Sequence, residues 1–446
     1  DGLSRGLYAT DASMYQMTPA VVVLPRTRAD AVKTVRLAAQ YGIPLLPRGG
    51  GTSLSGQTIA QGAVVIDFSK HMNRLLERLR ARLADTSPPG TETPCASPDR
   101  ACTAKAAPYP GITGEEALAV ARLPASDTLD ILAVAQAVRS TRKGPSATTC
   151  GIVNAKSGRC GEDCAFCAQS SRHATGAPVH GLLSPDALLR HAEELARAGV
   201  RRFGIVTSGN ALSEREFDAV CHAARLLRER VDIGLCASLG QLVTASAAAK
   251  SQNGPGGRAR RLKDAGISSY HHNLETTRSF FPHICTTHPY DDDIATVREA
   301  ARAGLRTCCG GILGLGETWE HRVELALTLR GLDVDSIPLN FLHPIPGTRL
   351  GHRSPLPPME ALRAIAVFRL LHPGRDILVC GGREATLGQW QSWVFAAGAN
   401  GLMVGNYLTT AGRALADDMD MLATLGVDGT APAGESVGDL SGEIRA

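Results

Sequence analysis

The sequence lacks several features that would point to particular classes of protein. None of its apolar runs reaches the length of a membrane-spanning helix, and its first residues, DGLSRGLYATD, lack the apolar core of a signal peptide. A net charge of +4 over 446 residues, without a long Lys/Arg run interleaved with aromatics, gives no indication of nucleic-acid binding. We therefore expect a cytoplasmic protein that binds neither membranes nor nucleic acids.

An initiator methionine is also absent, so we expect a fragment of a longer chain. Cysteine, by contrast, is plentiful. Twelve cysteines in a long chain without secretory features indicate a reducing compartment and metal chemistry rather than a disulfide framework. The length suffices for one large barrel and a smaller unit.

Three of the cysteines lie together in CGEDCAFC, which places Cys160, Cys164 and Cys167 at Cys-x3-Cys-x2-Cys spacing. Iron-sulfur clusters are normally held by four thiolates, so three thiolates on one loop leave one iron of a four-iron cluster open to another ligand. The alternatives are a zinc knuckle or three unrelated buried thiols. Zinc sites usually pair two Cys-x2-Cys units with a fourth ligand nearby, and none follows here. The spacing resembles the signature of the radical S-adenosylmethionine (SAM) superfamily.

Composition divides the chain into regions. Residues 1–77 are predicted to form a small α/β unit, with strands at VVVLP, IPLLP and GAVVIDF and a helix from Arg28 to Tyr41. Residues 78–114, rich in Ala, Pro, Thr and Ser, are predicted to be a linker. The acidic, Gly/Ala/Ser-rich residues 426–446 are predicted to be a disordered tail.

Residues 115–425 are predicted to form a TIM-type (β/α)8 barrel with lead-in helices. From Thr148 onward, β-rich runs alternate with helical patterns such as SPDALLRHAEELARAG and PYDDDIATVREAARAG. This alternation indicates a parallel sheet, and about eight runs fit a closed barrel whose active site lies at the C-terminal ends of the strands. The runs are TTCGIVNAK, RRFGIVTSG, DIGLCASLG, ISSYHHNLE, RTCCGGILG, SIPLNFL, DILVCGG and GLMVG.

Six motifs of this region together resemble the biotin synthase family of radical SAM enzymes. They are NAKSGRCGEDCAFCAQSS, YHHNLET, ICTTHPYDDD, CCGGILGLGETWEHR, SIPLNFLHPIPGT and CGGREATL. The resemblance implies a four-iron cluster on the three loop cysteines, SAM as cofactor and dethiobiotin as substrate. A radical derived from SAM would abstract hydrogen from dethiobiotin, and sulfide from an auxiliary iron-sulfur cluster would complete biotin. The resemblance also implies a reducing electron donor such as flavodoxin or ferredoxin, and a homodimer.

The resemblance implies cofactor-binding and substrate-binding residues as well. Asn273, Glu275 and Asn340 match family positions that contact the cofactor or the ureido ring of the substrate; the alternative is a capping or turn role. The segment GILGLGET resembles the glycine-rich strand end on which the family lays adenine and ribose; the alternative is an ordinary strand-to-helix turn. Its candidate residues are Gly311, Gly314, Gly316 and Glu317.

The expected auxiliary site departs from the better-known family pattern of three barrel cysteines and one arginine. Cys236, Cys308 and Arg383 match three of these positions, but Gly204 stands at the fourth. Cys380, which we expect on the strand that also presents Arg383, is the best replacement. The pattern resembles a subset of the family, associated with anaerobes, with a different auxiliary cluster, so a two-iron cluster or a larger variant is expected on these four residues.

Two further predictions concern cysteines near the expected auxiliary site. Side chains alternate across a strand, so only one of Cys308 and Cys309 faces the barrel interior without a bulge, and we choose Cys308. Cys285 is a further candidate ligand. Any of these thiols could instead be a small buried hydrophobe.

A second departure lies in PYDDD. The family usually carries an arginine near the position of Asp293, where it pairs with the cofactor carboxylate, and Arg298 is a candidate substitute one turn further on. His271 and His272 stand in or beside a position that is often Asn, and packing or capping is as good an interpretation as a ligand role.

The N-terminal unit resembles the opening of the FAD-binding domain of glycolate oxidase and vanillyl-alcohol oxidase relatives. Its loop PRGGGTSLSG, from Pro47 to Gly56, would wrap a pyrophosphate with backbone NH groups. The match stops near Glu77, before the second half of such a domain, so we expect a remnant that binds no FAD. Two alternative functions stay open: a non-sulfurating radical SAM enzyme of the same barrel subgroup, and a flavin oxidase fragment fused to an inactive barrel.

Overall fold

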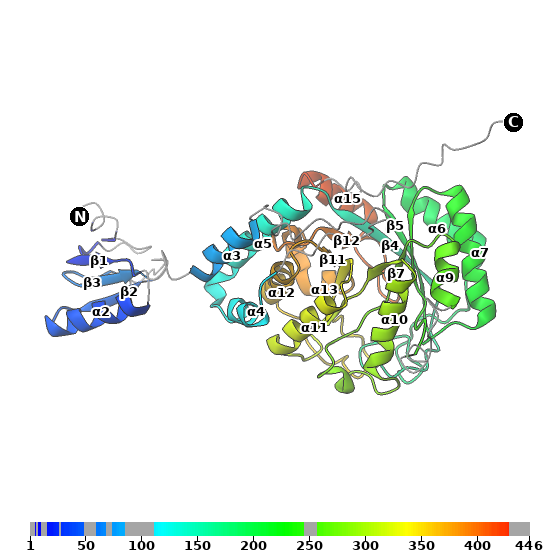
Figure 1. Cartoon of the computed structure of the whole chain (residues 1–446), viewed down its shortest axis with the longest axis horizontal. Coiled ribbons are helices and arrows are strands. Elements are labelled where there is room, and N and C mark those ends of the chain that lie inside the picture. The colour runs from blue at the N-terminus through cyan, green and yellow to red at the C-terminus, as the bar shows by residue number, and fades with distance from the viewer. Residues whose placement is uncertain are drawn as a thin grey trace, which may run out of the picture. The chain divides into compact units, whose positions relative to one another are not determined.

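The computed structural model divides into two compact units, Asp1–Arg82 and Leu83–Ala446, which we describe separately. Figure 1 shows the elements in chain order. The structure describes Arg5, Tyr8, Ala9 and residues 16–25, 28–48, 59–67, 74–84, 111–244 and 257–427.

The first unit is a small parallel sheet with a helix between its first two strands in sequence. Its strands have the order β1-β3-β2, with β3 in the middle and fully buried. The three predicted strands and the helix are confirmed. The predicted phosphate loop lies outside the described residues after Arg48. The elements are β1 (Val21–Val23), α2 (Arg28–Gln40), β2 (Leu45–Arg48), β3 (Val64–Asp67) and the following helix α3 (Arg74–Ala84).

The second unit is a closed parallel barrel, which confirms the predicted fold. The order of its strands is β11-β12-β4-β5-β6-β7-β8-β10-β9, and the pairing of β10 with β11 closes the ring. The eight predicted runs account for all of them: β4 (Thr148–Lys156), β5 (Arg202–Thr207), β6 (Gly234–Ser238), β7 (Ser269–His271), β8 (Arg306–Cys308), β9 (Gly311–Leu313), β10 (Ser336–Phe341), β11 (Asp376–Val379) and β12 (Gly401–Met403).

Strands β8 and β9 are two halves of one barrel strand. Both pair with β10, Cys308 opposite Ser336 and Gly311 opposite Leu339, so the register continues unchanged across the interruption. The barrel therefore has eight strand positions, as a TIM-type barrel requires.

Helices cover the outside of the barrel (Figure 1). Several begin with clear capping signals: Ser213 and Glu216 form a capping box at α7, and Ser184 caps α6, whose first residue is Pro185. The helices are α4 (Gly114–Ala121), α5 (Thr128–Lys143), α6 (Pro185–Arg197), α7 (Glu214–Arg230), α9 (Gly257–Asp264), α10 (Tyr290–Arg302), α11 (Trp319–Gly331), α12 (Pro358–Leu371), α13 (Arg383–Leu387), α14 (Trp393–Ala396) and α15 (Leu415–Thr424).

Alternate side chains of each strand face outward or inward. Val153 of β4, Phe203 of β5 and Leu235 of β6 belong to the buried core that the barrel shares with its helices. The intervening positions therefore face the barrel interior. This alternation decides which polar and thiol side chains can meet inside.

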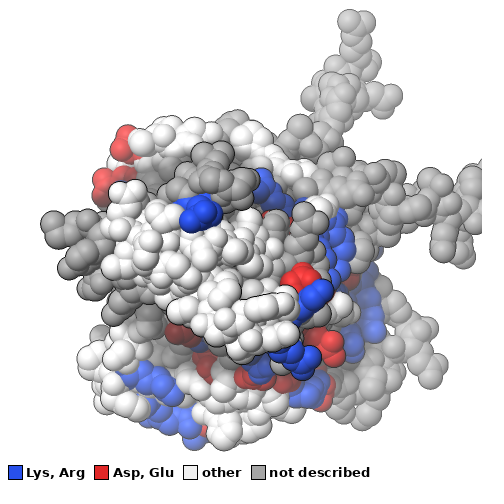
Figure 2. Space-filling view, turned by 90° about the vertical axis from the view of Figure 1, so that its left-hand side faces the viewer, with Lys and Arg blue, Asp and Glu red and all other residues white. Residues whose placement is uncertain are grey.

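Within the described residues, no helix is long and apolar enough to cross a membrane. On the face in Figure 2, Lys and Arg side chains are separated by Asp, Glu and uncharged surface rather than forming one continuous basic stripe. In the second unit, some surface charges pair with one another, as Arg261 does with Glu214.

Candidate active site and iron-sulfur sites

A cavity of about 390 Å³ opens at the C-terminal ends of the barrel strands. Its lining combines the cluster loop after β4 with residues at the ends of β5, β6, β7, β9, β10 and β12. The predicted site residues that line it are Cys160, Cys164, Cys167, Asn273, Glu275 and Asn340. The C-terminal rim is where barrels of this class build their active sites.

The cluster loop is shaped by its own backbone. The amide of Cys167 donates to the carbonyl of Cys164 at 2.9 Å, and the amide of Cys160 donates to the carbonyl of Gln169 at 3.0 Å. Arg159, just before the loop, adopts a left-handed φ of 50°. Burial raises the pKa of the Cys167 thiol to about 11. The loop thus brings three thiols to the cavity. With this raised pKa, the Cys167 thiol is protonated at neutral pH when no metal is bound.

Asp163 fastens the cluster loop to the segment before α10. Its carboxylate accepts hydrogen bonds from the amide and hydroxyl of Thr286 at 2.8 and 2.6 Å. Arg349 adds a bridge by donating to the carbonyls of Asp163 and Ile284, both at 2.8 Å. Burial would raise the pKa of Asp163, but hydrogen bonds from Thr286 and its neighbours hold it well below its ordinary value. The loop is therefore held from two directions.

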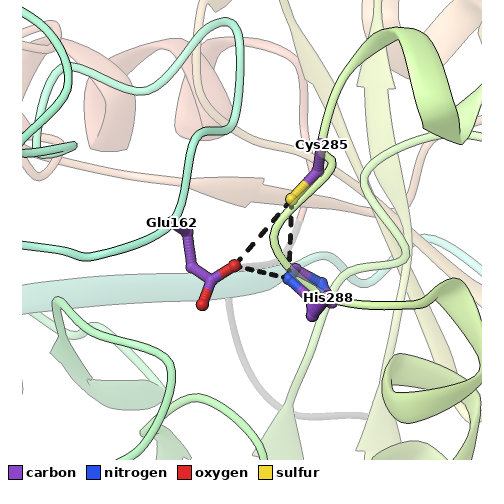
Figure 3. A group of neighbouring side chains, drawn as sticks. All are labelled: Glu162, Cys285 and His288. Atoms are coloured by element: carbon purple, nitrogen blue, oxygen red, sulfur yellow. Dashed lines mark hydrogen bonds and ion pairs between the residues drawn. The ribbon is translucent and has the colours of Figure 1, made fainter.

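Glu162 points from the cluster loop toward Cys285 and His288, as Figure 3 shows. Nδ1 of His288 lies 2.6 Å from a Glu162 carboxylate oxygen and 3.5 Å from the Cys285 sulfur. Burial alone would lower the pKa of His288, but hydrogen bonds to Asp293, Cys285 and Glu162 raise it to about 11. His288 is therefore a cation that joins the loop to Asp293.

Asp293 is buried and held by two histidines. His272 lies 2.9 Å from one of its oxygens and His288 lies 3.2 Å from the other. These contacts lower the pKa of Asp293 in spite of its burial. Arg298, the candidate substitute for the missing arginine, is exposed and does not line the cavity. The side chains that hold Asp293 at this wall of the cavity are therefore histidines.

A chain of polar side chains follows β7. Nε2 of His271 lies 3.1 Å from the amide oxygen of Asn273, whose amide nitrogen donates to Glu275 at 3.5 Å. Glu275 has a left-handed φ of 59°, which is uncommon for a residue with a side chain and clusters at functional sites. Burial and repulsion from Asp293 raise the pKa of Glu275 to about 7. Glu275 can thus switch between acid and base near neutral pH.

Asn340 connects three strands at the cavity wall. It donates to the carbonyl of Gly311 at 3.2 Å and accepts from the amide of Gly381 at 2.9 Å. In the glycine-rich segment, Ile312 rather than a glycine lines the cavity. Glu317 is bound within its own turn, by the amide of Gly314 at 2.8 Å and by Arg322 at 2.7 Å. Its role in this structure is to hold the turn.

The predicted auxiliary-site cysteines occupy the barrel interior below this cavity. Cys236 and Cys308 are buried at inward positions, and the Cys308 sulfur lies 4.0 Å from Nδ1 of His271. Cys380 packs inside with Leu378 and Met403. Cys309 instead raises the pKa of Tyr290 on α10, after the larger effect of burial, so it lies on the outer side as expected.

One interior cysteine was missed by the sequence analysis. Cys150 on β4 lies opposite Met403 on β12 and packs against the group that contains Cys380. Burial, followed by repulsion from Cys308, raises its pKa to about 12. The available signal was its place in TTCGIVNAK, at the same inward parity as Ile152.

Arg383 is placed differently from the expectation. Strand β11 ends at Val379, and Arg383 is the first residue of α13, so the prediction that one strand presents both Cys380 and Arg383 is wrong. The left-handed Gly382, with φ 75°, turns the chain between them. Arg383 is fully buried, and its guanidinium is bound to both oxygens of Asp418.

Known proteins are similar to this chain over most of its length. The chain is 88% identical over 356 residues to "Biotin synthase" of Nitratidesulfovibrio vulgaris (strain DSM 19637 / Miyazaki F), covering 80% of this chain and 97% of the relative. The chain belongs to the biotin synthase family. Another relative of that name, from Nitratidesulfovibrio vulgaris (strain DP4), is 62% identical over 80% of this chain and 99% of its own length. The resemblance stated from the motifs is confirmed.

Family models match three parts of the chain. The Radical SAM superfamily model matches residues 155–329, and the Biotin and Thiamin Synthesis associated domain matches residues 338–428. A FAD binding domain model matches residues 19–91. A solved structure, "Crystal structure of methylornithine synthase (PylB)", is similar at a TM-score of 0.62 and 15% identity, covering 79% of this chain and 97% of that chain. At this identity the likeness supports the barrel fold alone. Membership of the biotin synthase family makes the protein a radical SAM enzyme.

Proposed function

We propose that this member of the biotin synthase family inserts sulfur into dethiobiotin to form biotin, using SAM and an auxiliary iron-sulfur cluster. The observation that carries the proposal is the arrangement of the site. A thiol-bearing loop and polar side chains line the same cavity, and further thiols lie in the barrel interior. This arrangement supports a radical source, a substrate site and a sulfur source in one barrel.

We propose that Cys160, Cys164 and Cys167 hold a four-iron cluster. The donor set fits, because three thiols on one loop are the ligands such a cluster takes and the cavity leaves room for a further ligand beside them. When bound, the cluster and SAM supply the carbon-centred radical that removes hydrogen from the substrate. Asp163 and Glu162, on the same loop, would keep the three thiols in register through their contacts with the segment before α10.

The polar residues of the cavity are proposed to orient cofactor and substrate. Asn273 and Asn340 each offer an amide that can donate and accept at once, which suits a ureido ring or a ribose. Ionised Glu275 would accept hydrogen bonds from hydroxyl groups. Ile312 offers an apolar face for a flat ring beside Gly311, Gly314, Gly316 and Glu317. Cofactor and substrate that fill the cavity would exclude water from reactive species.

Cys236, Cys308 and Cys380 are proposed to hold the auxiliary cluster. They are buried, and the nearby groups include His271, which lies 4.0 Å from Cys308. Arg383 is a weaker candidate, because both its terminal nitrogens are already bound to Asp418. A two-iron cluster and a larger one both remain within the proposal.

Three further parts of the proposal concern the surroundings of the reaction. A reducing donor such as flavodoxin or ferredoxin would supply electrons, the enzyme would be a homodimer, and it would act in the cytoplasm. Residues 1–77 would be a remnant that binds no FAD. Sedimentation and flavin absorption of the purified protein test the dimer and the remnant.

The test of the central proposal is a product assay. Anaerobically reconstituted protein is incubated with dithionite, SAM and dethiobiotin, and mass spectrometry measures biotin, methionine and 5'-deoxyadenosine. We expect all three, and none from a variant with Cys160, Cys164 and Cys167 changed to Ala. Formation of 5'-deoxyadenosine without any biotin would instead favour a non-sulfurating radical enzyme.

A further inference from the structure

Four cysteines face the barrel interior, three from alternate strands and Cys380 from the position directly after β11. In the order of the closed sheet, β4, β6, β8 and β11 occupy the first, third, fifth and seventh strand positions, when β8 and β9 count as one. Inward side chains of alternate strands form one layer of four in a barrel of this kind. The register puts Cys150, Cys236 and Cys308 in one such layer with Leu378. Cys380 is the next inward position, two residues after Leu378.

The inward direction of each thiol follows from its neighbours. On β4, Gly151 faces α6, because an added Cβ would lie 2.6 Å from a Leu195 side-chain carbon; Cys150 therefore faces inward. Leu235 and Ala237, on either side of Cys236, belong to the outer core. Met403 packs with Cys380 inside the barrel and is also the register partner of Cys150.

Cys150 and Cys308 each lie close enough to the other three thiols for their charges to interact. Cys308 acts on Cys150, Cys236 and Cys380, and Cys150 acts on Cys236 and Cys380. Arg202 also acts on Cys150, Cys236 and Cys308, so a positive side chain lies beside the layer. Four neighbouring thiols are the usual ligand set of an iron-sulfur cluster.

We infer that Cys150 is the fourth ligand of the auxiliary cluster, so that four thiolates and no arginine hold it. This inference rests on the proposed function, because it assigns ligands to the sulfur donor of that reaction. The position of Arg383 on α13 and the bonds of both its terminal nitrogens to Asp418 argue against a ligand role. Gly204 on β5 offers no side chain, and β4 next to it supplies the thiol instead.

His271 is the competing ligand. It lies 4.0 Å from Cys308, but its Nε2 is bound to Asn273 and β7 occupies the fourth strand position, outside the alternate set. A histidine ligand would give the electron spin of the cluster a strong hyperfine coupling to nitrogen. A cluster held by four thiolates would show no such coupling.

The experiment compares full-length wild type with Cys150→Ser and with a matched control, Cys221→Ser. Cys221 is a buried thiol on α7 in the outer core. Iron and sulfide analysis with Mössbauer spectroscopy counts both clusters after anaerobic reconstitution. The spectral change of the loop cluster on adding SAM reports whether that site is intact.

We expect Cys150→Ser to lose the auxiliary iron and sulfide but keep the SAM-responsive cluster, while Cys221→Ser keeps both. Full auxiliary iron in Cys150→Ser, or nitrogen coupling that disappears in a His271→Gln variant, overturns the inference. If the wild type itself holds only the loop cluster, the auxiliary cluster proposed as sulfur donor is absent. That result contradicts the proposed function and is distinct from a failure of Cys150 as a ligand.

A rescue variant keeps the test decisive if Cys150→Ser loses both clusters. In Cys150→Ser with Gly204→Cys, the thiol moves to the neighbouring strand, next to Cys236 in the register. The new Cβ would lie 3.0 Å from an Ile152 side-chain carbon, so a small shift is needed. Return of the auxiliary iron supports a ligand role for Cys150, and failure of the double variant to regain it counts against that role.

Discussion

Arg383 and Asp418 form a completely buried ion pair in which two guanidinium nitrogens donate to the two carboxylate oxygens at 3.0 and 2.6 Å. The pair ties α13, directly after the last interior cysteine, to the C-terminal helix α15. It raises the pKa of Arg383 in spite of burial. Its geometry is that of a structural clamp under the cavity rim.

We expect Asp418→Ala to lower the free energy of unfolding by about 3 to 5 kcal/mol, because it leaves a buried guanidinium without its counter-charge. Urea titration followed by circular dichroism measures the change. The matched control is Asp417→Ala on the same helix, whose side chain is 60% exposed and whose loss should cost less than about 1 kcal/mol. Equal stability of the two variants would show that the pair is not a clamp.

The difference between expectation and structure at Arg383 has a physical origin. The segment CGGREATL has an apolar strand before it and no signal for where the strand ends. The strand ends at Val379, the left-handed Gly382 then turns the chain, and the partner Asp418 comes 35 residues after Arg383 in sequence. A contact of that separation cannot be read from local pattern.

The barrel strands, in contrast, were predictable because each is a short apolar run followed by a helical pattern. The cluster loop was predictable because its three thiols are local in sequence. Cys150 was missed because its meeting with Cys380 depends on the closure of the barrel, which pairs β12 with β4. The contacts of His288 with Glu162 and Asp293 likewise join segments that sequence alone does not bring together.

Asp163 leads to a second prediction. Replacing it with Ala removes the hydrogen bonds to Thr286 and the contact that fastens the cluster loop. Since hydrogen bonds to a charged group contribute about 1.5 to 3 kcal/mol each, we expect a chelator to extract iron from the reconstituted loop cluster at least about tenfold faster. Asp186→Ala, an exposed carboxylate on α6, is the control and should leave the rate unchanged.

Glu275 gives the cavity a pH dependence. Its pKa is raised to about 7 by burial and by Asp293, so the carboxyl is mostly protonated below that pH and ionised above it. Only the ionised form accepts charge-assisted hydrogen bonds from hydroxyl groups of a ligand. We therefore expect SAM affinity to increase as pH rises through about 7, by about five- to tenfold at most.

Equilibrium binding of SAM to the reconstituted enzyme, measured from about pH 6 to about pH 8, checks this sign. Glu275→Gln should bind more weakly at high pH and show a flat profile. Glu324→Gln is the control: Glu324 also accepts hydrogen bonds, from Ser279, but does not line the cavity. A wild-type profile that falls with pH would contradict the proposed contact.

The N-terminal unit is expected to be dispensable for the reaction. All residues that line the cavity lie between Ile152 and Thr410, in the second unit. The relative of 88% identity is covered to 97% of its length by 80% of this chain. That relative therefore lacks a counterpart of most of the remaining residues of this chain. Deleting residues 1–73, which leaves α3 whole, should keep cluster content and biotin formation within about twofold, a change of less than about 0.5 kcal/mol in transition-state free energy. Loss of biotin formation with both clusters retained would give the unit a role in electron delivery or substrate access.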